Sequence, residues 1–155
     1  MSEQAALTAL DDSGLPYRVI RHGPVSSLAE AAQARGVEPA AVIKTLVVRR
    51  GDGDYLFVLV PGDRTISWPK LRAAVGERRL SMPDADQARA ATGYERGTIT
   101  PFGSTQPWPV YADERIAGEI TLGAGAHGVA AAMDATAALA ALDAVVADLT
   151  EPEAT

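Results

Sequence analysis

"AAVIKTLVVRRGDGDYLFVLVP", residues 40–61, is the stretch that decides the fold. It contains two apolar runs, VIKTLVVRR at 42–50 and YLFVLVP at 55–61, and both are rich in the β-branched and aromatic residues typical of strands. The GDGD between them is typical of a tight turn, because Gly and Asp tolerate the backbone angles that short hairpins need. The stretch therefore predicts an antiparallel hairpin at the centre of the sheet.

Lys44 interrupts the first of these runs. Alternate side chains of a strand share a face, so Lys44 lies in one row with Val42, Leu46 and Val48. A buried ammonium group is costly unless it finds acceptors or loses its proton. Two interpretations remain open at this point. Lys44 either extends past the strand edge to solvent or forms the charged floor of a pocket.

The rest of the chain mixes helical and extended patterns without a regular alternation of one strand and one helix. Apolar spacing and capping residues, including Ser26 or Ser27 as an N-cap, predict helices over 3–10, 26–36, 67–76, 83–93 and 135–142. Extended patterns predict strands over 15–24, 110–113, 119–123, 129–133 and 145–149. We therefore expect an α+β fold in one domain, residues 1–155, with a mixed, largely antiparallel central sheet flanked by helices.

Composition narrows the classes of protein to consider. The chain has no cysteine, so disulfides and thiol nucleophiles are excluded. Its N-terminus lacks the basic start and apolar run of a signal peptide, and we expect a cytoplasmic protein without a membrane partner. The net charge of -6 argues against a broad DNA-binding surface but allows a local basic rim. Candidates for such a rim are Arg49, Arg50, Arg64, Arg78 and Arg79.

Two glycine-rich loops are candidates for ligand binding, GTITP at 97–101 and GAGAHG at 123–128. Their backbone N–H groups can approach a ligand closely, although ordinary turns would look the same in sequence. The histidines, His22 and His127, lack metal-ligand spacing, so we expect no metal site. The chain also lacks the GxSxG elbow of serine hydrolases. A reaction at these loops would therefore proceed without a protein nucleophile.

These pieces, taken in order, resemble the YbaK / prolyl-tRNA-synthetase-associated domains, which are free-standing trans-editing aminoacyl-tRNA deacylases. The resemblance runs from about Tyr17 to Leu149, nearly the whole chain. The shared order and spacing of the motifs support this resemblance more strongly than any single motif does. The motifs are YRVIRHGPV, VIKTLVV, VPGDRTISWPKL, ATGYERGTITPFG and LGAGAHG.

The resemblance implies a YbaK-like fold and hydrolysis of the ester that joins a wrong amino acid to the 3′ end of a tRNA. The implied tRNA is most often that for proline, and the implied amino acid is a small one, namely alanine, cysteine or serine. The implied partners are the acceptor end of aminoacyl-tRNA and prolyl-tRNA synthetase, and we expect no cofactor. The implied catalytic residues are Lys44, Gly97 and Pro101. The implied substrate-binding residues are His22, Thr45, Thr98, Ile99, Thr100, Gly123, Gly125, His127 and Gly128.

The last loop departs from the family pattern at two positions. His127 stands where relatives often have arginine, and Ala130 stands where cysteine-specific members tend to have aspartate. These departures favour an alternative, a non-catalytic module of the same fold that binds tRNA or a synthetase. A hydrolase of small free esters or amides is a further alternative, because related folds host different functions.

Overall fold

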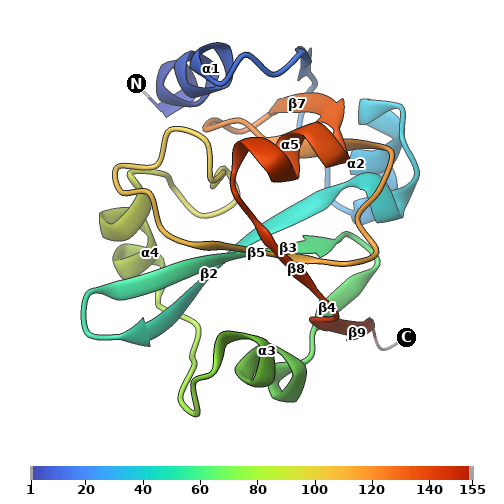
Figure 1. The fold of residues 1–155 in the computed structure, drawn as a ribbon. Coiled ribbons are helices and arrows are strands. Elements are labelled where there is room, and N and C mark those ends of the chain that lie inside the picture. Colours follow the sequence, from blue (N-terminus) through green and yellow to red (C-terminus); the bar gives the residue numbers. More distant parts are fainter. Residues whose placement is uncertain (1, 154–155) are drawn as a thin grey trace.

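The computed structural model describes residues 2–153, and in them helices surround a centre of strands (Figure 1). The helices of this part of the chain are α1 Ser2–Asp12, α2 Leu28–Arg35, α3 Trp68–Val75, α4 Ala85–Thr92 and α5 Ala135–Ala141, with a 3-10 turn at Pro39–Ala41. The strands are β1 Tyr17–Arg21, β2 Ile43–Gly51, β3 Asp54–Pro61, β4 Arg64–Ile66, β5 Val110–Asp113, β6 Glu119–Gly123, β7 Val129–Asp134, β8 Val145–Ala147 and β9 Thr150–Pro152.

The strands form three sheets. One has the order β1-β7-β6, the second has the order β2-β3-β5-β8, and the third pairs β4 with β9. Neighbours run antiparallel except in the β3-β5 and β5-β8 pairs, which are parallel. The predicted fold class, a mixed and largely antiparallel α+β arrangement, is confirmed, although the strands are divided among three sheets instead of one.

β3 is buried on both faces, which explains its unbroken apolar run. Phe57 and Leu59 belong to the larger apolar core, which the sheet β1-β7-β6 also lines. Val58 and Val60 point the other way, into a smaller core that includes Leu71 of α3. The hairpin thus separates two cores, and its position fixes where the other elements pack.

The predicted hairpin is present, but the expectation that both of its strands lie at the centre is wrong for β2. β3 has neighbours on both sides, whereas β2 forms the edge of its sheet. The two short strands β4 and β9 were missed by the sequence patterns. They pair only with each other, through Arg64 and Pro152 at one end of the register, and three residues carry too little periodicity to be recognised.

The ends of two predicted helices are set by local caps. Ser27, the second of the two candidate serines, accepts a hydrogen bond from the Glu30 backbone at the start of α2. Asp84 and Gln87 form a capping box, so α4 begins after Asp84 and not at Pro83 as expected. The helix predicted over 3–10 extends further in both directions, and the last predicted strand ends at Ala147.

The long segment between α4 and β5 is held by side chains despite its glycines and prolines. The Tyr94 hydroxyl donates to the Phe102 carbonyl at 2.6 Å, and burial raises the pKa of Tyr94 to about 12. The Trp108 indole donates to the Ala91 carbonyl at 2.8 Å, and its ring meets Tyr55 edge to face. These contacts anchor the loop against the larger core and position residues 97–101.

Candidate functional site

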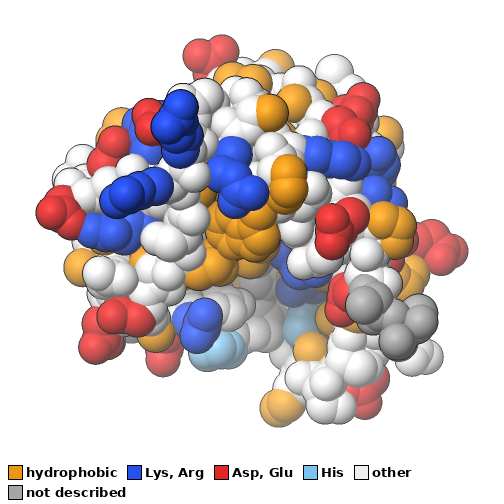
Figure 2. Space-filling view, turned by 90° about the horizontal axis from the view of Figure 1, so that it is seen from below, with side chains coloured by type: hydrophobic (Ala, Val, Ile, Leu, Met, Phe, Trp, Pro, Cys, Tyr) orange, Lys and Arg blue, Asp and Glu red, His pale blue; other side chains and the backbone are white. Residues whose placement is uncertain are grey.

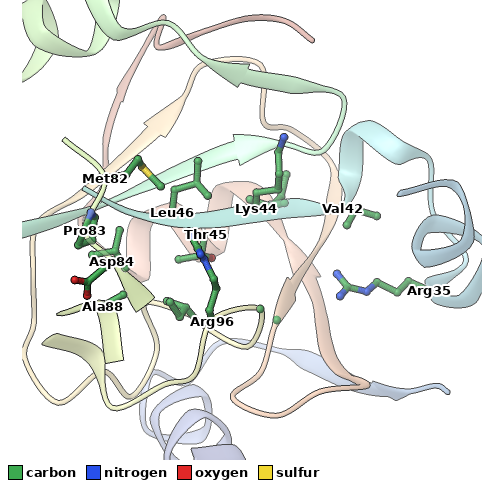
Figure 3. Close-up of a pocket in the computed structure, with 15 residues that line it drawn as sticks. Arg35, Val42, Lys44, Thr45, Leu46, Met82, Pro83, Asp84, Ala88 and Arg96 are labelled. Atoms are coloured by element: carbon green, nitrogen blue, oxygen red, sulfur yellow. The ribbon is translucent and has the colours of Figure 1, made fainter. Parts of the chain in front are cut away.

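A cavity of about 280 Å³ lies along the free edge of β2 (Figure 3). Its walls come from β2, the end of α2, the segment that precedes α4, and both glycine-rich loops. The residues that line it are Arg35, Val42, Ile43, Lys44, Thr45, Leu46, Val47, Met82, Pro83, Asp84, Ala88, Arg96, Gly97, Ile99 and Gly123.

The edge of β2 is free only between two isolated bridges. Val42 bridges Thr121 at one end, and Arg49 exchanges two backbone hydrogen bonds with Ser81 at the other. Backbone groups of a strand alternate in direction, so those of Thr45 and Val47 point the same way as those of Arg49, away from β3. The cavity therefore offers backbone donors and acceptors as well as side chains.

Lys44 points to the opposite side of β2 from Thr45 (Figure 3). Its ammonium group donates to the Arg64 carbonyl at 2.5 Å and lies 3.7 Å from the Glu153 carboxylate. About a third of its side chain is exposed, 36%. Lys44 therefore shows features of both interpretations. It lines a pocket, as one interpretation predicts, and it also reaches solvent, as the other predicts, while its ammonium group has hydrogen-bond and ion-pair acceptors.

Two arginines line the cavity in addition to Lys44. Arg35 is half-buried at the end of α2, and its Nη1 donates to the Thr121 hydroxyl at 3.1 Å. Burial lowers the pKa of the Arg35 guanidinium. Arg96 is exposed beside Gly97. Among the lining residues only Asp84 is acidic, so the cavity carries a net positive charge.

The two glycine-rich loops are joined by a hydrogen bond from the Gly125 N–H to the Thr98 carbonyl at 3.0 Å. Gly97 adopts a φ of 89°, and a Cβ there would lie 3.3 Å from the His127 ring. The Gly97 position thus requires a residue that tolerates the left-handed region and leaves room for His127. His127 itself is exposed, with Nε2 4.0 Å from the Glu95 carboxylate.

The structure brings five of the predicted site residues to the cavity wall, and the other seven do not line it. Those at the wall are Lys44, Thr45, Gly97, Ile99 and Gly123. Thr98, Thr100 and Gly125 are buried, Pro101 is half-buried, and His127 is exposed. His22 lies beside Gly128, with its N–H donating to the Gly128 carbonyl at 2.9 Å, and its Nδ1–H donates to the Gly23 carbonyl at 2.8 Å.

Sequence reasoning missed Arg35, Met82 and Arg96 as wall residues. Arg96 lies inside the motif ATGYERGTITPFG, directly before Gly97, so the sequence could have indicated its place beside the loop. Arg35 gave no signal, because a basic residue in the last turn of a helix is ordinary.

Positive charge is concentrated locally although the chain is acidic. On the face seen in Figure 2, Lys and Arg side chains surround an apolar hollow. Of the expected rim, Arg49 pairs with Asp52 and Arg50 with Asp54, whereas Arg78 and Arg79 are exposed. The expected rim is therefore partly neutralised, and the cavity itself holds further cations.

Residues 2–153 contain no group of three or more His, Asp or Glu side chains placed to hold a metal ion. No helix within them is long and apolar enough to cross a membrane.

Comparison with known proteins gives one consistent family. Residues 22–139 match the model of the aminoacyl-tRNA editing domain. A candidate Cys-tRNA(Pro)/Cys-tRNA(Cys) deacylase, EbsC of Enterococcus faecalis, is 27% identical over 82% of this chain and 79% of its own length. A proline–tRNA ligase of Moorella thermoacetica is 37% identical over 65% of this chain, which spans only 17% of that ligase.

A solved structure described as that of a candidate trans-editing enzyme for prolyl tRNA synthetase has the same fold. It superposes with a TM-score of 0.89 at 28% identity and covers 97% of both chains. The chain therefore belongs to the aminoacyl-tRNA editing domain family, and it is an editing hydrolase that deacylates mischarged aminoacyl-tRNA.

Proposed function

We propose that the protein removes a small wrong amino acid, alanine, cysteine or serine, from the 3′ acceptor end of tRNA for proline. The names of EbsC and of the solved trans-editing structure both refer to proline tRNA or its synthetase, which supports this tRNA. The single observation that carries the proposal is a small cationic cavity at the two glycine-rich loops, of a size that suits a small side chain with part of a nucleotide.

A water molecule acts as the nucleophile in this proposal. The lining residues include no Ser, Cys or His, so neither the Ser–His nor the Cys–His pair of the common covalent hydrolases is present among them. An aminoacyl ester is already activated, and positioning supplies much of the rate. The substrate's own ribose hydroxyl or backbone carbonyls at the edge of β2 orient the water.

Backbone amides stabilise the developing oxyanion. Within residues 2–153, the N–H groups of Gly97 and Ile99 have no hydrogen-bond partner, and both residues line the cavity. Preorganised amides of this kind cost no reorganisation during the reaction. The Thr98 carbonyl accepts a hydrogen bond from the Gly125 N–H, and this bond keeps the loop of residues 97–101 in place beside Gly123.

Lys44 binds the negative charge of the terminal nucleotide or of the transition state. Lys44 lines the cavity and its side chain is partly exposed, so an incoming phosphate can reach its ammonium group. An ammonium group suits this role as a compact charge with three donors. Before substrate binds, the Glu153 carboxylate and the Arg64 carbonyl keep the Lys44 ammonium group in this position.

Prolyl-tRNA synthetase is the proposed partner, because this chain is similar to part of a proline–tRNA ligase. A free-standing editor that acts on the product of that enzyme gains selectivity by working beside it. The cavity alone discriminates weakly between amino acids, since a difference of one methylene group changes kcat/KM only by ~10–200-fold. Aminoacyl-tRNA is made and used in the cytoplasm, where we place the protein.

The test is hydrolysis of tRNA for proline charged with alanine, cysteine, serine or proline. Wild type is expected to clear at least one mischarged species and to spare the prolyl ester. Lys44→Ala is expected to lose at least tenfold in kcat/KM, because it removes the charge at the cavity edge. Lys70 of α3 is the second lysine of the chain and pairs with Asp148, so Lys70→Ala is the matched control. Failure to hydrolyse any of the four esters would contradict the proposal.

A further inference from the structure

The Arg35 guanidinium is a half-buried cation without a carboxylate partner in residues 2–153. Its Nη1 donates to the hydroxyl of Thr121, which is fully buried, and its Nε has no hydrogen-bond partner in this part of the chain. Removing a guanidinium from water without an anion is costly. The position therefore favours an anionic ligand that compensates the charge when it binds.

The acid at the cavity wall does not neutralise Arg35. Asp84 is committed to the N-terminus of α4, where its carboxylate accepts the Gln87 backbone N–H at 2.7 Å. Arg96, the neighbouring cation at the wall, also lacks an ion pair within residues 2–153. The cavity thus holds an excess of positive charge on the side of the glycine-rich loops.

Figure 3 shows how these cations are distributed. Arg35 extends from α2 on the same side of β2 as Thr45 and Arg96, whereas Lys44 extends on the opposite side. The strand edge therefore separates two cationic walls of one cavity. A ligand that satisfies both must carry more than one negative group or span the strand edge.

We propose that Arg35, oriented by Thr121, binds a phosphodiester group of the tRNA 3′ strand at a subsite across β2 from Lys44. This inference rests on the proposed function. The aminoacyl ester has no free carboxylate, and its ammonium group is repelled by a guanidinium. The anions that remain in the substrate are backbone phosphates, whose geometry matches the planar donors of arginine.

The test measures binding of a short oligoribonucleotide that ends in CCA, over a range of salt concentrations. Arg35→Gln is expected to weaken binding about tenfold at low salt, the loss of a charge-assisted hydrogen bond. It is also expected to reduce the slope of log K against log salt by about 0.7, one phosphate contact to a single strand. Arg89→Gln is the matched control. Arg89 is exposed on α4 and does not line the cavity, so this substitution removes the same charge at a position away from the cavity wall.

Deacylation gives a second readout that separates phosphate binding from a structural role. On mischarged tRNA, Arg35→Gln is expected to raise KM with little change in kcat, because the phosphate is held equally in ground and transition states. A fall in kcat with unchanged oligonucleotide binding would overturn the assignment. Equal losses in Arg35→Gln and Arg89→Gln would also overturn it, since they would indicate a general effect of charge.

Failure of the inference and failure of the proposed function are distinguishable. If wild type deacylates mischarged tRNA while Arg35→Gln binds the oligonucleotide normally, the function stands and the phosphate subsite is overturned. If wild type shows no deacylation, and the oligonucleotide titration nevertheless shows the Arg35-specific loss of affinity, the subsite is supported without the function.

Should Arg35→Gln fail to fold, Thr121→Val is the second variant, because it retains the charge of Arg35 and removes the hydroxyl that orients it. A loss of affinity of at least about threefold in Thr121→Val supports the assignment, and unchanged affinity overturns it.

Discussion

The Lys44 ammonium group lies 3.7 Å from the Glu153 carboxylate, so the C-terminal segment reaches the lysine of the cavity. Pairing of β9 with β4 produces this contact, because it places Pro152 opposite Arg64, whose carbonyl also accepts from Lys44. An acidic side chain therefore stands where the proposed substrate brings a phosphate. The two anions compete for one ammonium group.

Replacement of Glu153 is expected to favour substrate. Glu153→Gln removes the competing carboxylate, and KM for mischarged tRNA should fall about twofold, a small effect because exposed ion pairs are weak. The measurement is initial-rate kinetics at low salt, where the change is largest. Glu151→Gln is the control, because Glu151 lies on β9, two residues before Glu153, and is also exposed. Identical effects of both variants would indicate net charge instead of a specific contact.

The wall residue Gly123 sets part of the cavity volume. Its φ is ordinary, and an added Cβ would lie 3.5 Å from the Ile99 carbonyl, a normal contact, so Gly123→Ala should fold. The new methyl group narrows the cavity, and kcat/KM is expected to fall by about tenfold, more for cysteinyl than for alanyl ester. Gly23→Ala, with open space around it, should retain wild-type kinetics. An unchanged ratio of the two esters would show that this wall does not contact the amino acid.

The close approach of the last loop to His22 requires glycine at position 128. Gly128 has a φ of 77°, and an added Cβ would lie 2.5 Å from the His22 carbonyl. Gly118 has a similar φ of 70° but open space around it. Gly118→Ala should therefore lose about 1 kcal/mol of unfolding free energy from backbone strain alone. Gly128→Ala should lose at least about 3 kcal/mol, because the clash adds to the strain. Equal losses in denaturant unfolding would contradict the contact.

Acid should weaken the attachment of the C-terminal segment. Arg115 and then Lys70 hold the pKa of Asp148 below its ordinary value of 3.8, because both cations donate to its carboxylate. A lowered pKa in the folded protein means that the stabilisation is present above the ordinary pKa and is lost as the pH falls through the folded value. Asp148→Asn is expected to flatten the decline of unfolding free energy in this acid range, measured against wild type. Added salt should shrink the difference, since all three side chains are partly exposed. A salt-independent difference would contradict an ionic origin.

The sequence by itself determined the elements whose signal is local. The hairpin of residues 43–61 follows from two apolar runs around a tight turn, and α2 follows from Ser27 and Gly36 at its ends. The apolar run of β3 also predicted a strand at the centre of the sheet, and β3 does have a neighbour on each side. Such features depend on side-chain periodicity and on caps that lie within a few residues of each other.

Only the tertiary structure decided which edge of the hairpin stays open and which side chains meet there. Thr121 and Ser81 bridge the ends of β2 from distant parts of the chain and leave the cavity between them. Arg35 reaches Thr121, and Glu153 reaches Lys44, by the same long-range pairing. Periodicity reports the face on which a side chain lies but not the partner that packs on that face, because pairing of distant strands is decided by the whole core.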